Sequence, residues 1–323
     1  VGDSVPSLPY RECTGCTACS QLCHVNAIKM VTDLEGFLRP EIDSKKCINC
    51  GMCERVCPLK QDHMSMNDLK QRVYAGKIKE SVAHKKSQSG GVFFALASEI
   101  LNQNGIVYGA AQNHNFETHH IRVSTKNELS RLQGVKYVQS ILGDAFTYVA
   151  EDLTNGNKVL FSGTPCQVAG LKSYLSSKRI AQENLIAVDL VCYGVPSPGV
   201  FSKWIAVLER TYHSRINEMC YRRTDSMWGH GGERYVFRNG KILEGAFYTK
   251  LYFNALIIRS SCENCEFCSA SRVGDITLGD FWGINKVMPD FFDDRGVSLV
   301  ICNTEKGTQY LDSVKAQLYL RES

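Results

Sequence analysis

The sequence of 323 residues lacks the features that mark several large classes of protein. No stretch approaches the roughly 18 uninterrupted apolar residues of a membrane-spanning helix, so we expect no membrane span. The net charge of +4 is too small to suggest a nucleic-acid-binding protein. Residues 1–12 contain no apolar core of a secretory signal, and we expect a cytoplasmic location. A composition of 44% hydrophobic and 22% charged residues predicts an ordinary soluble chain, long enough for about two domains.

Two glycine-rich nucleotide motifs are also missing. Neither G-x-G-x-x-G after a strand nor G-x-x-x-x-G-K-S/T occurs in the chain, which disfavours the standard nicotinamide-binding fold and the P-loop. The segment 229–232 is rich in glycine, but it precedes an expected hairpin and not a helix. We interpret it as a loop.

Cysteine is abundant, with 15 residues, and eight of them lie between positions 13 and 57. They form two copies of C-x2-C-x2-C-x3-C that begin at Cys13 and Cys47. A disulfide framework is more typical of small secreted chains, and zinc would need one C-x2-C pair answered by another. In two-cluster ferredoxins the first three cysteines of each copy bind one 4Fe–4S cluster, and the fourth binds the other. The spacing therefore predicts two 4Fe–4S clusters.

The crossed pattern assigns four ligands to each cluster. Cluster one is predicted at Cys13, Cys16, Cys19 and Cys57, and cluster two at Cys47, Cys50, Cys53 and Cys23. The segment resembles the bacterial two-cluster ferredoxin. His24 stands where proline is usual after the fourth cysteine, and we do not expect it to be a ligand. Between the two copies, residues 35–40 are predicted to form a short hairpin that supports the cluster loops.

The predicted domains are a ferredoxin domain at 1–58, a polar linker at 59–72 and a larger domain at 73–323. In fold class, we expect an α+β ferredoxin-like two-cluster domain followed by an α/β domain with an added antiparallel β portion. Apolar runs predict its strands at 73–76, 106–110, 158–162, 185–192, 275–278 and 297–302. A helical stripe runs through 92–101, and a tight Asn239-Gly240 turn predicts a β-hairpin from Arg234–Phe237 and Lys241–Leu243.

Two helix starts in the larger domain could bind a ligand. The run Ser87-Gln88-Ser89-Gly90-Gly91 either holds an anion at the free helix N–H groups or supplies an ordinary serine N-cap. The run Gly163-Thr164-Pro165-Cys166-Gln167 places Cys166 at a helix N-terminus, where a thiolate is stabilised. Cys166 could then be a nucleophile, a cluster ligand or a buried thiol.

The other polar and cysteine residues of this domain fall into groups. Cys166, Cys192, Cys262, Cys265 and Cys268 are five candidates for a third cluster, which needs four. Cys220 and Cys302 lie in apolar contexts and are predicted to be core residues. We expect His114, His119 and His120 to lie on a solvated surface. Arg222, Arg223, Arg234 and His230 could line the path of an anionic substrate, although a solvated basic face is the simpler expectation.

Six short motifs occur in a recognisable order along this domain. They are Ser89-Gly90-Gly91, Gly134-Val135-Lys136-Tyr137, Gly163-Thr164-Pro165-Cys166-Gln167, Val191-Cys192-Tyr193-Gly194, Cys262-Glu263-Asn264-Cys265 and Gly274-Asp275-Ile276-Thr277-Leu278-Gly279-Asp280. The array resembles the coenzyme F420 hydrogenase/dehydrogenase beta-subunit family. The resemblance implies FAD beside a third 4Fe–4S cluster. It places FAD near Ser89, Gly90, Gly91, Lys136, Tyr137, Thr164 and Pro165, and the cluster on Cys166, Cys192, Cys262 and Cys265.

Cys268 is then the surplus thiol, since related sequences often carry tyrosine there; if Cys268 is a ligand instead, Cys166 is released. The resemblance implies an iron–sulfur flavoprotein oxidoreductase that moves electrons between FAD and one-electron carriers. A small hydride donor or acceptor and a ferredoxin or another redox subunit are the expected partners, and a homo-oligomer is possible. An electron-relay subunit without its own substrate is the alternative, and a thiol oxidoreductase using Cys166 is a third. No catalytic side chain is identified.

Overall fold

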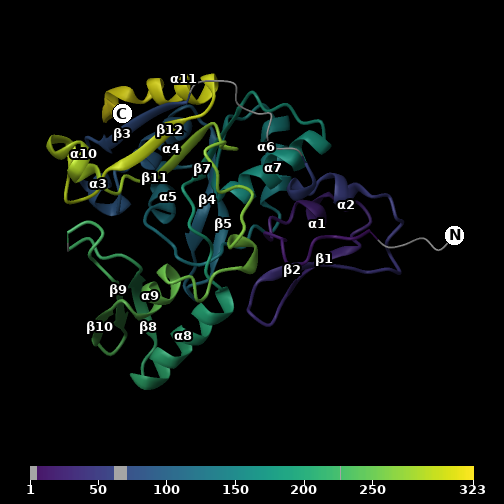
Figure 1. Ribbon diagram of the computed structural model, residues 1–323, viewed down its shortest axis with the longest axis horizontal. Helices are drawn as coiled ribbons and strands as arrows, with labels where there is room; N and C mark the ends of the chain where they lie inside the picture. Colours follow the sequence, from purple (N-terminus) through teal and green to yellow (C-terminus); the bar gives the residue numbers. More distant parts are fainter. Residues whose placement is uncertain (1–5, 62–70, 226) are drawn as a thin grey trace.

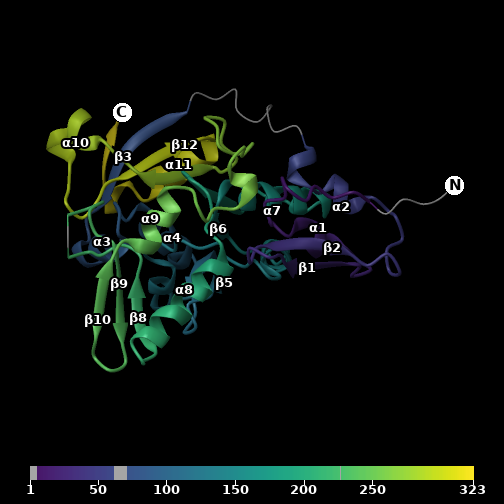
Figure 2. The same ribbon diagram turned by 60° about the horizontal axis from the view of Figure 1, so that its bottom comes forward.

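The computed structural model describes residues 6–61, 71–225 and 227–323. Three regions are distinguished in it: an N-terminal segment, a large mixed sheet with helices on both faces, and a smaller sheet (Figure 1). The N-terminal segment lies at one end of the molecule, beside the helices on one face of the large sheet (Figure 2). Most of the predicted linker, residues 62–70, falls outside the described residues.

The N-terminal segment contains two short helices and a hairpin. Its elements are α1 (Ala18–Leu22), β1 (Ile28–Thr32), β2 (Leu38–Ile42), α2 (Met52–Arg55) and the 3-10 helix η1 (Pro58–Lys60). Strands β1 and β2 pair antiparallel, with Thr32 opposite Leu38. The hairpin expected around residues 35–40 is thereby confirmed, with strands that extend beyond it.

The large sheet has eight strands. They are β3 (Arg72–Ile78), β4 (Ile106–Gln112), β5 (Thr118–Val123), β6 (Val159–Gly163), β7 (Leu185–Leu190), β11 (Ile276–Asp280), β12 (Ser298–Cys302) and β13 (Leu318–Glu322). Their order is β13-β3-β12-β11-β7-β6-β4-β5, and β11, β7, β6 and β4 run parallel. The carboxyl ends of these four strands therefore meet at one edge, where open α/β sheets usually bind ligands.

Helices cover both faces of this sheet. Side chains alternate along each strand, so both faces carry apolar side chains against which helices can pack. In β6, Leu160 packs into the core around α4 (Val92–Asn102), while Val159 and Phe161 pack into the core around α6 (Ala145–Thr154) and α7 (Pro165–Ser177). The second core also contains Ala18, Leu22 and Val56 of the N-terminal segment. The remaining helices of this region are α3 (Ser81–Ser87), α5 (Lys126–Leu129), η2 (Ser130–Leu132), α10 (Ile284–Val287), η4 (Pro289–Phe291), α11 (Glu305–Ser313) and η5 (Lys315–Gln317).

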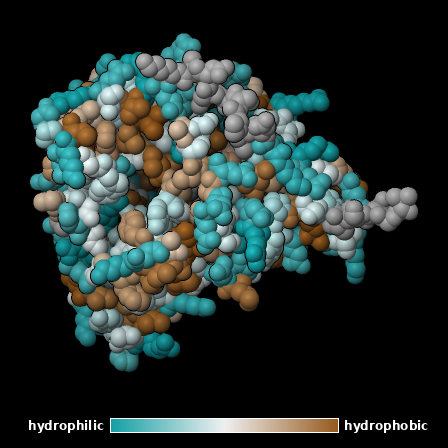
Figure 3. All heavy atoms as spheres, in the orientation of Figure 1, coloured by the Kyte–Doolittle hydropathy of each residue, from teal (hydrophilic) through white to brown (hydrophobic). Residues whose placement is uncertain are grey.

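The smaller sheet is antiparallel. It consists of β8 (Ile216–Cys220), β9 (Glu233–Phe237) and β10 (Ile242–Gly245), in the order β10-β9-β8. It shares a core with α8 (Pro198–Thr211) and α9 (Phe247–Phe253), and η3 (Ser260–Cys262) follows. The predicted hairpin is confirmed, and the fold class is confirmed as α/β with an added antiparallel portion. The view in Figure 3 shows a surface hollow between the large sheet and this smaller one.

The predicted strands of the large sheet are all present, but two strands at its edges were not predicted. Edge strands β5 and β13 have exposed and polar residues that hide the apolar alternation. The prediction that His120 lies on a solvated surface is wrong. In β5 its ring stacks on Phe161 with ring centres 5.2 Å apart, and its nitrogens lie 3.0 Å from the Ser162 carbonyl and 2.9 Å from Ser140 Oγ. Desolvation lowers the pKa of His120 to about 4.

Among the described helices, none combines the length and the apolar character needed to cross a bilayer.

Candidate electron-transfer and flavin site

The first cysteine loop encloses a cavity. Cys13, Cys16, Cys19 and Cys57 all line it, together with apolar side chains such as Leu8, Met30 and Leu59. The loop needs a left-handed backbone at Gly15, with φ of 72°, and at Thr17, with φ of 63°. This turn lets three sulfurs spaced by two residues face the same space. The structure thus gathers the four residues that the spacing assigned to cluster one.

The second cysteine loop repeats this backbone. Asn49 and Gly51 have φ of 54° and 68° at the positions equivalent to Gly15 and Thr17. Cys53 is buried, whereas Cys50 is exposed. Cys23 follows α1 directly and accepts a hydrogen bond at Sγ from the Ala27 N–H, at 3.3 Å. The second copy of the ferredoxin motif therefore has the same loop conformation as the first.

A second cysteine-lined cavity lies at the carboxyl edge of the large sheet. Its lining includes Cys166, Cys192, Cys262, Cys265 and Cys268. The first three come from the start of α7, the segment after β7 and η3, so elements far apart in sequence bring them together. Cys268 is exposed, whereas the other four are partly buried. All five line the same cavity, so the choice of Cys268 as the surplus thiol stays a prediction.

The two cavities suit iron–sulfur cubes better than single metal ions. Within the described ranges, no three His, Cys, Asp or Glu side chains are grouped to hold one ion. A 4Fe–4S cube binds each thiolate at a separate iron, so its ligands surround a cavity instead of meeting at a point. The buried Ser261 hydroxyl also lines the second cavity and has no hydrogen-bond partner among the described residues. Such a donor fits a cluster, whose sulfides accept hydrogen bonds.

Burial changes the interpretation of Cys166. Helix α7 has a complete capping box of Thr164 and Gln167, and Cys166 occupies its first turn as predicted. However, desolvation raises the pKa of Cys166 to about 11, so the stabilised thiolate expected from the helix end is wrong for the free thiol. Desolvation likewise raises the pKa of Cys192 and of Cys262. Buried thiols of this kind are poor nucleophiles, and metal binding is what favours their thiolates.

The Ser89-Gly90-Gly91 run lies beside the carboxyl end of β3, where the Ile78 N–H donates to the Gly90 carbonyl at 2.7 Å. The N-cap of α4 is Gly91, with φ of 76° and no side-chain cap, so the serine N-cap alternative is wrong. The first N–H groups of α4 therefore donate no hydrogen bond to a capping side chain, which suits an anion. The glycines also have a packing role: a Cβ at Gly90 would lie 2.1 Å from the Gly76 carbonyl oxygen, and one at Gly91 would lie 2.6 Å from Ile78.

Tyr137 and the Ser89 run are linked through Arg222. Its guanidinium donates to Tyr137 Oη at 2.5 Å and to the Gln88 carbonyl at 3.0 Å, and it forms an ion pair with Asp280 at 2.9 Å. Asp280 ends β11, so this group also lies at the carboxyl edge of the sheet. The Arg222 guanidinium further lies over the Trp282 ring, and Trp282 stacks on Trp228 with ring centres 4.7 Å apart.

Trp228 itself is buried, and its Nε1 has no partner in the part of the chain that the structure describes. An unsatisfied buried donor beside aromatic rings and a buried arginine fits a planar heteroaromatic group that carries phosphates. The residues present therefore fit a flavin nucleotide.

Lys136 is positioned differently from its neighbour. Its ammonium donates to the carbonyls of residues 131–134 at distances from 2.8 to 3.4 Å, so it closes the end of η2. Desolvation lowers the pKa of Lys136 to about 7. Thr164 and Pro165 lie elsewhere: Pro165 lines the second cysteine cavity, and the Thr164 hydroxyl lies 3.2 Å from Cys166 Sγ.

The predicted solvated basic face is wrong for Arg222, which is 7% exposed. Arg223 and Arg234 are partly exposed, and both form ion pairs with Asp225 and Glu244. His230 is exposed, as expected. The arginine charges are therefore matched by carboxylates, and only Arg222 is placed beside the candidate flavin residues. Cys302 is buried as predicted, whereas Cys220 is only partly buried at the end of β8.

Two residues that the sequence did not single out connect the cysteine cavities. Thr14 lines both of them, and its carbonyl accepts a hydrogen bond from Gln139 at 2.9 Å. Arg259 lines the second cavity and contacts the loop of the first. A basic residue three positions before Cys262 was the only available signal for Arg259. Thr14 lies inside the first motif, but nothing in the motif indicated its second neighbour.

Two family models match this chain. A family model for the carboxyl-terminal part of the coenzyme F420 hydrogenase/dehydrogenase beta subunit matches residues 156–323, just over half of the chain. The chain belongs to this family. A second model, for a 4Fe-4S dicluster domain, matches residues 12–60. This member of the coenzyme F420 hydrogenase/dehydrogenase beta-subunit family is thus an iron–sulfur protein with a ferredoxin-type segment.

One relative and one solved structure illustrate the two parts of this family member. The ferredoxin-type protein NapF of Haemophilus influenzae is 36% identical over 56 residues, which cover 17% of this chain and 31% of that protein. The chain thus spans about a third of this curated relative's length. A chain of the F420-reducing NiFe hydrogenase complex from Methanosarcina barkeri has a similar fold, with a TM-score of 0.55 and 15% identity. The likeness covers 81% of this chain and 84% of that one.

Proposed function

We propose that this protein is an iron–sulfur flavoprotein oxidoreductase that connects a hydride-type organic substrate with one-electron carriers. Twelve cysteines would hold three 4Fe–4S clusters. These are Cys13, Cys16, Cys19 and Cys57 for cluster one, Cys47, Cys50, Cys53 and Cys23 for cluster two, and Cys166, Cys192, Cys262 and Cys265 for the third. The proposed organic substrate is a deazaflavin of the coenzyme F420 type, after the family to which the chain belongs.

The observation that carries this proposal is the shared wall of the two cysteine cavities. Thr14 lines both cavities, so cluster one and the third cluster would lie on either side of one residue. Cys16 also lies against α7, the helix that carries Cys166: a Cβ added at Gly170 would be 2.9 Å from Cys16 Sγ. This arrangement supports direct electron transfer between the N-terminal segment and the larger domain.

The residues for FAD are proposed at the carboxyl edge beside the third cluster. The start of α4 after Ser89-Gly90-Gly91 would hold the pyrophosphate, and Arg222, held by Asp280 and Tyr137, would face the cofactor. When bound, FAD supplies hydride exchange with the organic substrate and single-electron exchange with iron–sulfur centres. Lys136 would act indirectly by fixing the loop that carries Tyr137, and the Thr164-Pro165 turn would separate the flavin from the third cluster.

A role as an electron-relay subunit is the second candidate. It is favoured by one observation: the solved structure with a similar fold is a multisubunit hydrogenase complex. In that case a ferredoxin or another redox subunit would be the direct partner, and the organic chemistry would occur elsewhere. The clusters and their ligands would be the same in both candidates, so only the substrate separates them.

The test uses the anaerobically purified full chain. We expect about one non-covalent FAD and about twelve irons per chain, and reduction of a one-electron viologen acceptor by reduced coenzyme F420 without another protein. Bound FAD without turnover by the single chain would favour the relay candidate. Absence of FAD from freshly purified, iron-loaded protein would overturn the flavoenzyme proposal.

A variant pair sharpens the flavin assignment. Arg222→Gln should lower FAD affinity about tenfold or more, because it removes a buried charged donor. Arg223→Gln is the matched control, since Arg223 pairs with Asp225 and Glu244 at the neighbouring position, and FAD content should stay unchanged. Gly91→Leu is unsuitable, because its Cβ would already clash with Ile78. Equal FAD affinity in both variants would move the flavin away from Arg222.

A further inference from the structure

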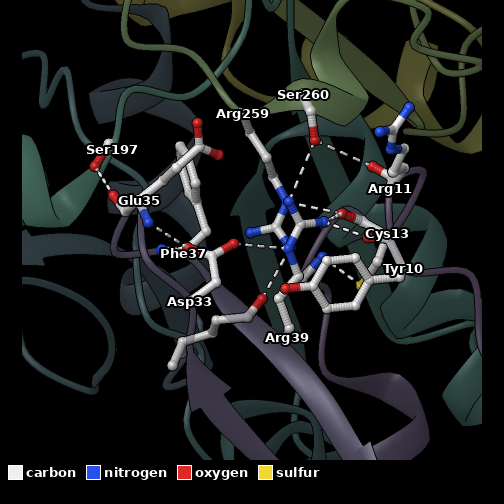
Figure 4. A network of polar contacts seen from close by, with 12 residues as sticks. Tyr10, Arg11, Cys13, Asp33, Glu35, Phe37, Arg39, Ser197, Arg259 and Ser260 are labelled. Atoms are coloured by element: carbon white, nitrogen blue, oxygen red, sulfur yellow. Dashed lines mark hydrogen bonds and ion pairs between the residues drawn. The ribbon is translucent and has the colours of Figure 1, made fainter.

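Arg259 is a fully buried arginine between the two cysteine cavities, with a relative exposure of 0%. Its Nε donates to the Cys13 carbonyl at 2.7 Å, and its Nη atoms donate to Gln139 Oε1 at 2.9 Å and to the Leu38 carbonyl at 2.8 Å. Figure 4 shows the guanidinium pointing from the η3 side toward the cluster-one loop. Arg259 also lines the second cysteine cavity, where the third cluster is proposed.

Each nitrogen of the Arg259 guanidinium has one of these acceptors, but none of them balances its charge. All three are neutral, and the ring of Phe37 lies 5.1 Å from the guanidinium carbon. A buried cation is costly unless an opposite charge lies close to it. The nearby carboxylate of Asp33 is bound by Arg39 at 2.9 Å, so these two charges offset each other. The anionic groups available to Arg259 would be the cysteine-bound clusters themselves, since Arg259 contacts the loop of the first cavity and lines the second.

The local backbone makes room for this arrangement. A Cβ at Gly15 would lie 2.9 Å from Arg259 Nη1, so glycine at this position of the first motif lets the guanidinium approach the cluster-one loop. Gln139 joins the same group, because it accepts from Arg259 and donates to the Thr14 carbonyl. Thr14 is the residue that lines both cavities, and Gln139 connects it to Arg259.

We propose that Arg259 is the fixed counter-charge of cluster one and the third cluster, raising the reduction potential of both. This inference rests on the proposed function, in which these two sites exchange electrons. Adding an electron makes a cluster more negative, and a buried cation beside it favours that state through a weakly screened field. The hydrogen bonds of the Arg259 side chain go to the first cysteine loop, Leu38 and Gln139. The charge of Arg259 should therefore change the reduction potential of cluster two much less. Arg259 thus acts as a positioning residue that keeps the two inner clusters easily reduced.

The experiment is a redox titration followed by electron paramagnetic resonance on the full chain. Variants that each lack one cluster, through loss of Cys57, Cys23 or Cys192, assign the signals. Arg259→Gln should decrease the ratio of reduced to oxidised cluster at least tenfold for cluster one and the third cluster at a fixed potential. That decrease corresponds to a shift of about −59 mV for one electron. Cluster two should shift much less.

Two further variants separate charge from structure. Arg259→Lys keeps the positive charge and should restore most of the potential, although it cannot make all three hydrogen bonds. Gln139→Glu places a carboxylate beside the unchanged guanidinium and should lower the same two potentials, even if Arg259→Gln fails to fold. The control is Asp33→Asn combined with Arg39→Gln, which removes one buried charge of each sign and should leave the potentials near wild type.

The possible outcomes are distinct. Equal shifts of all three clusters, unchanged potentials in Arg259→Gln and Gln139→Glu, or equal behaviour of Arg259→Lys and Arg259→Gln would overturn the inference. Iron content tests the proposed function separately. About eight irons in wild-type protein would show that the third cluster is absent. The effect of Arg259 on the potential of cluster one could still be measured in that case. A shift of the control double variant as large as that of Arg259→Gln would assign the effect to structural disturbance.

Discussion

The two cysteine loops of the N-terminal segment have the same spacing and the same backbone but different surroundings. Cys13-x2-Cys16-x2-Cys19 and its repeat from Cys47 both contain two residues with a left-handed backbone between their cysteines. Yet Cys16 is 8% exposed, and desolvation raises its pKa to about 12, whereas its counterpart Cys50 is exposed. The motif is therefore equal in both copies, and the environment is not.

The difference comes from the larger domain. The first loop and the following α1 pack against α6 and α7: Gln21 Oε1 accepts from the Phe146 N–H at 3.0 Å, and a Cβ at Gly170 of α7 would lie 2.9 Å from Cys16 Sγ. Arg259 reaches the same loop from the far side. The comparison shows how two copies of one motif acquire an inner and an outer place. An inner cluster one would exchange electrons with the larger domain, and an outer cluster two would exchange them with a partner.

The largest effect is expected from breaking the crossed ligand pattern. Cys57→Ala should remove about four of about twelve irons, and the lost cluster should be the inner one, because Cys57 lines the cavity of Cys13. Cys23→Ala should lose the outer cluster instead. Iron analysis and the rate at which a chelator removes the remaining iron provide the measurement. If Cys57→Ala leaves a slowly chelated inner cluster in place, the crossing is wrong.

A similar loss is expected in the larger domain. Cys192→Ala should lower the iron content by about four, whereas Cys268→Ala should keep all of it, because Cys268 is exposed at the rim of the cavity. In Cys192→Ala, reduced FAD should no longer pass electrons to the N-terminal clusters. Rapid-mixing spectroscopy checks this directly. Wild-type rates of cluster reduction in that variant would place the electron path outside the third cluster.

Metal removal should distinguish a ligand from a free thiol at Cys166. In the iron-loaded chain Cys166 should resist brief alkylation, and removal of the iron by a chelator should expose it. Peptide mapping gives the modified positions, with the exposed Cys268 as the internal reference that reacts in both samples. Fast alkylation of Cys166 in fully loaded protein would transfer its ligand position to Cys268 and revive thiol chemistry as a function.

The smallest effect concerns the contact that makes the first loop the inner one. Gly170→Ala would place its Cβ 2.8 Å from Cys16 Cβ, so we expect a loss of about 1–3 kcal/mol in the free energy of unfolding. Gly245→Ala is the matched control, since nothing lies within 4 Å of its added Cβ. Chemical denaturation under anaerobic conditions measures both. Equal stability of the two variants would show that α7 can shift away from the first loop to accommodate the added methyl group.

Much of the architecture follows from local patterns. Apolar runs identified β3, β4, β6 and β12, and the Asn239-Gly240 turn identified the β9–β10 hairpin. The sequence failed at β5, because an edge strand can carry polar residues and His120 reaches a buried site from it. The serine cap failed for a different reason: Gly91 caps α4, which the pattern of serines and glycines did not reveal.

For this protein, the sequence alone determined which residue types could bind clusters and which loops could hold them, because ligand spacing and turn conformation are local properties. It could not distinguish an inner loop from an outer one, nor could it find that Thr14 lines both cavities and that Arg259 contacts the first loop. Those features depend on contacts between residues about 245 positions apart, such as the 2.7 Å hydrogen bond from Arg259 to the Cys13 carbonyl. Only the tertiary structure decides them, because burial and charge at a site are set by the elements that pack around it.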